Sequence, residues 1–176
     1  STCFMLDGDD WLAHKDVLRQ VAVYMDTNRA DMVYNSMQIS FNGSVTNFHG
    51  IDGSPGVADY TDFEKSSRKF RQLGWKACHP RIMEAQLLKH VDPAKHLMFE
   101  GEWIKCCTDL AESFVCLEQA RNPMKLHLST PAYVYNKDNS MRFENSFYRR
   151  LESVHSQREH DETRAFVTGC TPTNFA

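Results

Sequence analysis

Apolar positions change their spacing several times along the chain, and each change predicts a different element. Residues 3–6 form a short apolar run, typical of a buried parallel strand, and the acidic turn 7–10 follows at once. In residues 14–30 apolar positions recur every three or four residues, which predicts an amphipathic helix. Its apolar stripe comprises Val17, Leu18, Val21, Ala22 and Met25.

After this helix the apolar positions recur at every second residue. Positions 37, 39 and 41 are apolar in an alternating run, and Asn42-Gly43 follows. An Asn-Gly pair after alternating residues is the strongest short-range signal of a β-hairpin. Gly, Pro and Asp are concentrated in 50–61, so this stretch is expected to be a surface loop rather than a domain boundary.

The second half of the chain returns to helical spacing. Helices are predicted at 62–73, 81–91 and 108–120, with a short strand or turn at 75–79. In the last of these helices Thr108 is the expected N-cap residue, and Asn122-Pro123 is the expected stop.

Two further short strands are predicted at 124–129 and 132–136, and a charged helix at 142–166 closes the chain. The sequence contains no internal repeat and no low-complexity tract. Strands that alternate with helices, together with one hairpin, predict an α/β layer architecture.

Composition narrows the classes of partner. The chain has 176 residues, of which 41% are apolar and 11% aromatic, enough for one compact domain with a core. Its formal net charge of -3 leaves no basic surface for phosphates, and no basic run interleaved with aromatics occurs. We therefore expect no nucleic-acid partner.

The positions of the cysteines indicate whether the protein resides in an oxidising or a reducing compartment. Four of the six cysteines, at positions 78, 106, 107 and 116, lie in apolar segments rather than in a spaced disulfide framework, and the adjacent pair is no zinc knuckle. A reducing compartment is the simpler interpretation. No apolar run approaches the ~18 residues of a membrane span, and no signal segment opens the chain. A cytoplasmic protein without a transmembrane segment is expected.

The acidic turn is the first candidate site. Asp7 and Asp9 follow a predicted strand, where open α/β sheets place ligands. Clustered carboxylates repel one another unless a cation neutralises them, and oxygen ligands suit Mg²⁺ or Mn²⁺. The ordinary alternative is a solvated acidic turn that caps the helix starting near His14.

Two other motifs share these residues. Haloacid-dehalogenase-type phosphatases also place Asp-x-Asp after an apolar strand, with the first Asp as nucleophile. Here Asp10 and Trp11 replace their Gly and Thr, and Lys125 and Asp138 are poor substitutes for the later phosphatase residues. A calcium loop of the EF-hand type is excluded, because Trp11 and Leu12 stand where it needs an oxygen ligand and Gly.

The segment "FMLDGDDWLAHKDVL" combines an apolar strand, an Asp-x-Asp-Asp turn and a following helix, and "ADMVYNSMQISFNG" is a strand pair after it. Taken in order with "GWKACHPRI", "TDLAESFVCLEQA" and "PAYVYN", these segments resemble family-2-type inverting glycosyltransferases with the GT-A fold. In that family the first segment binds the metal, the third is a Trp-x-x-x-His-x-Arg stretch, the fourth is the helix that bears the base, and the fifth is the next strand. The resemblance covers roughly residues 3–136, and agreement in family order is far more specific than a lone motif.

The resemblance implies transfer of a sugar from a nucleotide-sugar donor to an acceptor hydroxyl on a glycan, lipid-linked or protein acceptor, with inversion. Asp7 and Asp9 are the implied ligands of Mn²⁺ or Mg²⁺, and together with Asp10 they form the donor site. His79 and Arg81 are implied neighbours of the donor. The structural alternatives are an ordinary internal histidine and a surface arginine.

The implied general base is Asp109, in the first turn of its helix. An acidic residue there is also favoured by the helix dipole alone. Glu102, Trp103 and Glu112 are the acceptor candidates. A buried tryptophan and a solvated glutamate are the structural alternatives.

For the fold, the resemblance implies a GT-A-like mixed sheet flanked by helices. Residues 1–150 would form the partial glycosyltransferase domain, apparently without its N-terminal nucleotide-binding βα segment, and 151–176 a charged C-terminal helix and tail. The alternative is a non-catalytic binding or structural remnant of such a domain. An uncovered sheet edge also predicts self-association.

Overall fold

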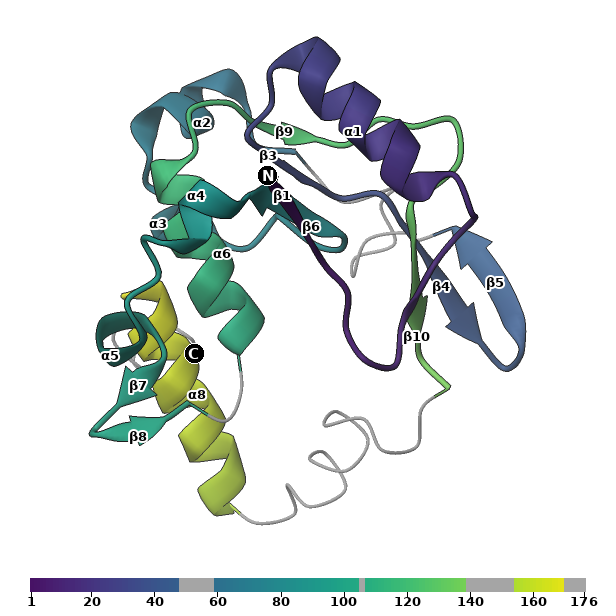
Figure 1. Cartoon of the computed structure of the whole chain (residues 1–176). Coiled ribbons are helices and arrows are strands. Elements are labelled where there is room, and N and C mark those ends of the chain that lie inside the picture. The colour runs from purple at the N-terminus through teal and green to yellow at the C-terminus, as the bar shows by residue number, and fades with distance from the viewer. Residues whose placement is uncertain (48–58, 105–106, 139–153, 170–176) are drawn as a thin grey trace.

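The computed structural model describes residues 1–47, 59–104, 107–138 and 154–169, and in 154–160 only the backbone. It confirms the predicted α/β class: mixed sheets are packed against helices (Figure 1). Among the described helices, none has the length and apolar character needed to cross a membrane.

The central sheet has four strands in the order β1 (Thr2–Met5), β6 (Arg81–Glu84), β3 (Met32–Tyr34) and β9 (Pro123–Lys125). β3 and β9 are parallel, whereas β6 runs antiparallel to both of its neighbours. The prediction of a buried parallel strand at 3–6 was therefore wrong. β1 lies at the edge of the described sheet, pairs antiparallel and is only partly buried.

A second sheet has the order β2 (Trp11–Leu12), β10 (Tyr133–Asn136), β4 (Met37–Phe41) and β5 (Ser44–Asn47). The strands β4 and β5 form the predicted hairpin, and Asn42 and Gly43 have φ angles of 51° and 71° at its turn. Left-handed conformations at both central residues are those of a type I′ turn, which Asn-Gly favours.

The chain passes from β3 into β4 through Asn35 and Ser36. The Ser36 amide donates to the carbonyl oxygen of His79, and the Ser36 carbonyl oxygen accepts from the amide of Tyr133. This crossing brings residues 78–79 and the start of β10 together beside the junction of the two sheets.

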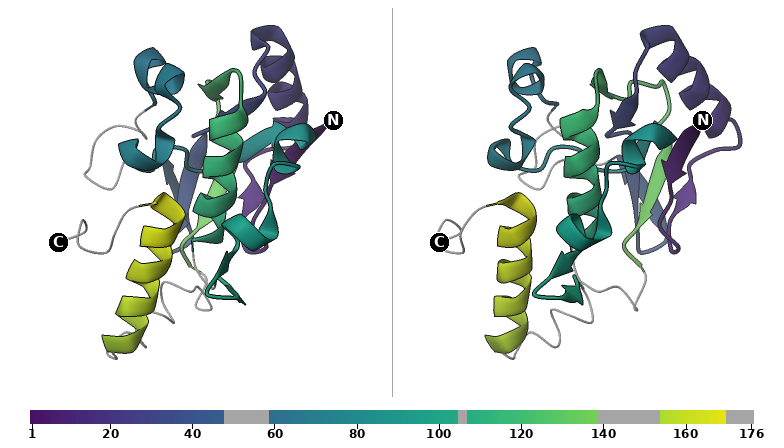
Figure 2. Two further views of the ribbon diagram at one scale, coloured as in Figure 1. Left: turned by 90° about the vertical axis from the view of Figure 1, so that its left-hand side faces the viewer. Right: turned by 60° about the vertical axis from the view of Figure 1, so that its left-hand side comes forward.

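Two helices cover opposite faces of the central sheet (Figure 2). α1 (Val17–Asn28) packs with Val33 and Ile82, and α6 (Thr108–Gln119) packs with Met32 and Met83. Because successive strand residues point to opposite faces, β3 and β6 each contribute to both core clusters.

The predicted helix at 81–91 was wrong in its first turn. Residues 81–84 form strand β6, and helix α4 (Ala85–Leu88) begins only afterwards. Ile82 and Met83 belong to different core clusters on the two faces of the sheet, so the apolar run satisfies a strand rather than one face of a helix.

Three further predictions about helices need correction, and they concern α1, α6 and the helix predicted at 62–73. Within α1, Val17, Val21 and Met25 are buried, but Leu18 and Ala22 are exposed. α6 begins one residue earlier than expected, because its N-cap is Cys107 in a left-handed conformation and Thr108 is already helical.

In place of the single helix predicted at 62–73, the structure has two short helices, α2 (Asp62–Ser67) and α3 (Phe70–Leu73). A left-handed Arg68 separates them. The stretch 75–79 has no regular secondary structure.

The remaining described elements lie beside the start of α6. They are α5 (Pro93–His96), β7 (Met98–Phe99), β8 (Glu102–Trp103) and α8 (Val154–Thr168). Val167 of α8 joins the same core cluster as α6, and Phe166 packs on Phe99 with ring centroids 5.1 Å apart. Most of the loop predicted at 50–61 lies outside the described residues, as do residues 142–153 of the helix predicted at 142–166.

Candidate functional site

The acidic turn connects β1 to β2, and strand β10 fixes its shape. The Asp10 amide donates to the Asp7 carbonyl oxygen at 3.1 Å, which closes the turn. The Tyr133 hydroxyl accepts from the Asp7 amide at 3.2 Å and donates to Asp10 Oδ2 at 2.7 Å. Asp10 Oδ1 accepts from the Asn136 amide at 2.8 Å. Asp10 is thus held by two residues of β10.

The pairing of the strands explains why these groups meet. In the β1–β6 pair Met5 lies opposite Arg81, two residues before Asp7, and in the β2–β10 pair Trp11 lies opposite Val134. The turn between β1 and β2 is therefore bounded by the beginning of β6 on one side and by β10 on the other.

Asp7 contacts two of the other predicted site residues. Its Oδ1 lies 3.3 Å from Arg81 Nη2, and its Oδ2 lies 3.8 Å from His79 Nε2. The His79 ring stacks between Tyr133 and Tyr135, at centroid distances of 5.0 and 5.4 Å. This stacking restricts the imidazole to one plane beside the acidic turn.

Among the described residues, Asp7, Asp10 and His79 offer potential metal-ligand atoms that lie within 4.8 Å of one another. Two carboxylates and one imidazole suit Mn²⁺ better than Mg²⁺, which prefers oxygen ligands alone. Asp9 is not in this group. Its carbonyl oxygen accepts from Asn136 Nδ2 at 3.1 Å, and its role as a ligand stays a prediction.

Arg81 links the acidic turn to α6. Its Nη1 lies 3.6 Å from Asp109 Oδ2 while Nη2 faces Asp7, and the side chain is only 4% exposed. The interpretation of Arg81 as a surface residue was therefore wrong. Figure 1 shows the start of α6, where Asp109 lies, at the same end of the central sheet as the turn after β1.

Glu112 follows Asp109 by one helical turn and is partly buried. Burial raises the pKa of its carboxyl group, Asp109 and Asp7 raise it further, and Arg81 opposes the shift. Burial also raises the pKa of the neighbouring Cys78 thiol to about 11, with a further contribution from Asp109. The thiol is therefore protonated at neutral pH and is a poor nucleophile.

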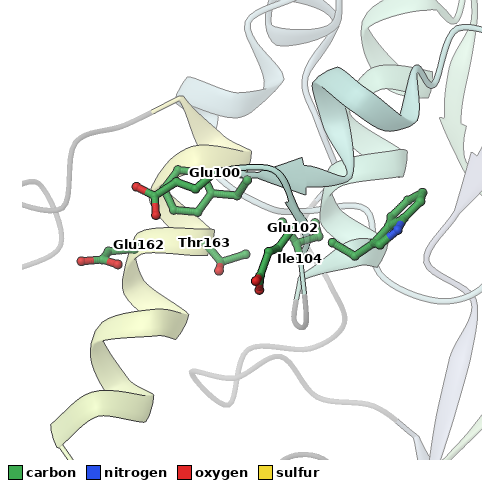
Figure 3. Close-up of a pocket in the computed structure, with 7 residues that line it drawn as sticks. Glu100, Glu102, Ile104, Glu162 and Thr163 are labelled. Atoms are coloured by element: carbon green, nitrogen blue, oxygen red, sulfur yellow. The ribbon is translucent and has the colours of Figure 1, made fainter.

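The other two acceptor candidates lie in a different place, a pocket of about 350 Å³ between the β7–β8 hairpin and α8 (Figure 3). Glu100 and Glu102 come from the hairpin, whereas Glu162 and Thr163 come from α8. Trp103 also lines this pocket and is 61% exposed, so the buried-tryptophan alternative was wrong.

Asp138, considered as a later residue of a phosphatase site, is engaged elsewhere. Its carboxylate accepts from the amides of Asn42 and Gly43 and from the Ser40 hydroxyl, which caps the turn of the β4–β5 hairpin. These bonds lower the pKa of Asp138, the Asn42 amide most. This arrangement accounts for the aspartate without a phosphatase mechanism.

Sequence reasoning missed Tyr133, Tyr135 and Asn136, which it assigned only to a strand. Burial, followed by the hydrogen bond to Asp10, raises the pKa of Tyr133 well above its usual value, so its hydroxyl stays protonated and donates. The available signal was the spacing: tyrosines at positions 133 and 135 share one face of a strand.

Comparisons with known proteins gave no match: no protein-family model fits the sequence, and no curated protein and no solved structure is significantly similar to the chain.

Proposed function

We propose that this chain carries the catalytic residues of a divalent-cation-dependent glycosyltransferase, which moves a sugar from a nucleotide-sugar to an acceptor hydroxyl with inversion. A GT-A-like fold that binds the donor at the acidic turn is part of the proposal. It is supported by the motif order and by the way four separate segments supply one cluster.

The single observation that carries the proposal is a continuous series of side-chain contacts from the acidic turn to α6. Asp7 contacts both His79 and Arg81, and Arg81 contacts Asp109. The resemblance assigns these four residues to a donor site and a base, from motifs that lie up to about a hundred positions apart in the sequence. Residues from segments this far apart come together only through the fold.

The potential ligand atoms of Asp7, Asp10 and His79 fit a metal ion. They place a pair of carboxylates beside an imidazole that two tyrosine rings hold in one plane. When bound, a divalent cation supplies neutralisation of the charge that develops on a diphosphate leaving group. Tyr133 and the Asn136 amide keep Asp10 oriented through hydrogen bonds.

Asp109 is the proposed general base. It accepts the proton of the acceptor hydroxyl as the sugar is transferred, and Glu112 binds a second acceptor hydroxyl from the next turn of α6. Glu102 and Trp103 extend the acceptor site at the pocket beside α8, where an exposed indole face suits packing against a sugar ring.

The test measures release of nucleoside diphosphate from uridine, guanosine and thymidine diphosphate sugars, with Mn²⁺ and a mixture of sugar acceptors. We expect metal-dependent turnover with one donor class. Asp109→Asn should lower the rate by a factor of ~10²–10⁴, because a positioned base contributes that much.

Asp62→Asn is the matched control, since Asp62 is an exposed acid in the first turn of α2. This variant should keep the parental rate. If Asp109→Asn retains more than about a tenth of the rate, Asp109 is not the base. Mn²⁺-dependent binding of a nucleoside diphosphate without turnover of any donor would contradict catalysis and support the binding-remnant alternative.

A further inference from the structure

Arg81 is a buried cation shared by two carboxylates that come from different parts of the fold. Asp7 belongs to the turn after β1, and Asp109 belongs to the first turn of α6. Both carboxylates are partly exposed, at 44% and 39%, whereas Arg81 is 4% exposed. The arginine therefore forms the inner end of the contact between them.

We propose that Arg81 is a positioning residue that couples the cation site at Asp7 to the orientation of Asp109. The proposal rests on the proposed function, because it assigns a coupling between two parts of that same site. It makes Arg81 a link within the protein rather than a ligand of the donor phosphates.

The geometry of the guanidinium supports this role. Its two terminal nitrogens face different carboxylates, 3.3 Å from Asp7 and 3.6 Å from Asp109. Its Nε is buried and has no hydrogen-bond partner among the described residues. Among the described residues the two carboxylates are the ion-pair partners that orient the planar group, and a change at one alters its position toward the other.

Competition for Asp7 gives the coupling its sign. A divalent cation at Asp7 would share that carboxylate with Arg81 and would repel the guanidinium, which would then pair more strongly with Asp109. Conversely, removing the Asp109 charge would leave Asp7 as the ion-pair partner of Arg81 among the described residues, which would oppose cation binding. The coupling is reciprocal, as linkage requires.

A double-mutant cycle on Mn²⁺ binding tests the proposal. Calorimetry with Mn²⁺ alone would be run on the parent chain, Arg81→Gln, Asp109→Asn and the double variant. We expect Arg81→Gln to bind Mn²⁺ several-fold more tightly, because a nearby positive charge is removed, and Asp109→Asn to bind it several-fold more weakly. In the Arg81→Gln background, the change in Mn²⁺ binding free energy caused by Asp109→Asn should fall to half or less of its value in the parent chain.

The cycle separates coupling through Arg81 from a direct effect of charge. If the Asp109→Asn effect is the same with and without Arg81, the two carboxylates act independently and the proposal fails. An unchanged Mn²⁺ affinity in Arg81→Gln would also overturn it, since a merely structural arginine would lower only the melting temperature.

Arg71→Gln is the matched control. Arg71 is a partly buried arginine that is likewise paired with a carboxylate of α6, at 2.8 Å from Glu118, and this variant should leave Mn²⁺ affinity unchanged. Should Arg81→Gln not fold, Arg81→Lys keeps the charge but not the planar group. It should bind Mn²⁺ about as the parent does and lose most of the coupling to Asp109. Full coupling in the lysine variant would contradict the proposal.

These measurements contain no sugar nucleotide. Failure of the coupling and failure of sugar transfer can therefore be told apart: the cycle reports on Arg81, and the turnover assay reports on the reaction.

Discussion

At the scale of single residues, Glu112 carries an electrostatic cost that depends on pH. Burial raises the pKa of its carboxyl group above the ordinary value of 4.5, and Asp109 and Asp7 act in the same direction. Between that ordinary value and the raised one, the folded protein binds more protons than the unfolded chain. The free energy of unfolding therefore falls as pH rises through this window, and the loss is complete above the folded pKa.

We expect Glu112→Gln to raise the melting temperature at about pH 7.5, where the charged carboxylate is costly, and to give no gain at about pH 4, where the parent side chain is protonated. Thermal unfolding followed by circular dichroism across this range would measure the difference. Glu118→Gln is the control. Because Glu118 is paired with Arg71, removing its charge should not raise the melting temperature. A pH-independent difference for Glu112→Gln would contradict the assignment.

At the scale of elements, one buried carboxylate fastens the end of α6 to the beginning of β3. Asp31 is 3% exposed and accepts from the amides of Arg121 and Asn122, at 2.6 and 2.9 Å. The Arg121 side chain adds an ion pair at 3.5 Å. These bonds hold the chain between α6 and β9 so that β9 can pair with β3.

Asp31→Ala should lower the free energy of unfolding by about 3 kcal/mol, because two amides lose a charged acceptor. Urea unfolding would measure the change. Asp26→Ala, an exposed acid on α1, should alter stability by no more than about 0.5 kcal/mol. If the two variants unfold alike, the Asp31 carboxylate does not hold the two elements together.

At the scale of the whole molecule, the central sheet is covered on both faces, but β1 pairs only with β6 among the described residues. Large apolar side chains are exposed directly after β1, at Leu6 (46%), and on α1, at Leu18 (55%) and Val23 (58%). A free strand edge and exposed apolar side chains both favour association with another chain.

We expect the average mass in sedimentation equilibrium to rise with protein concentration. Leu6→Glu, at the residue directly after β1, should lower this association, whereas Phe63→Glu, at an exposed apolar position on α2, should not. A constant monomer mass for the parent chain over the whole concentration range would refute the expectation.

The sequence determined the elements whose signals are local. The spacing of Val17, Val21 and Met25 was enough for α1, and Asn42-Gly43 was enough for the β4–β5 hairpin. The α/β class followed from the alternation of such elements. Local signals failed at β6, because the adjacent apolar residues Ile82 and Met83 fit a short strand and a helix turn equally well until the neighbouring elements are known.

Only the tertiary structure decided how the site is assembled. Tyr133 and Asp10 are 123 residues apart in sequence, yet their hydrogen bond is one of those that hold the acidic turn in shape. The choice of Asp10 rather than Asp9 beside His79, the burial of Arg81 and the separation of Glu102 from Glu112 likewise depend on strand pairing and helix packing. The physical reason is that local spacing sets which face of an element is apolar, whereas contacts between distant segments are set by the order and register in which those elements pair.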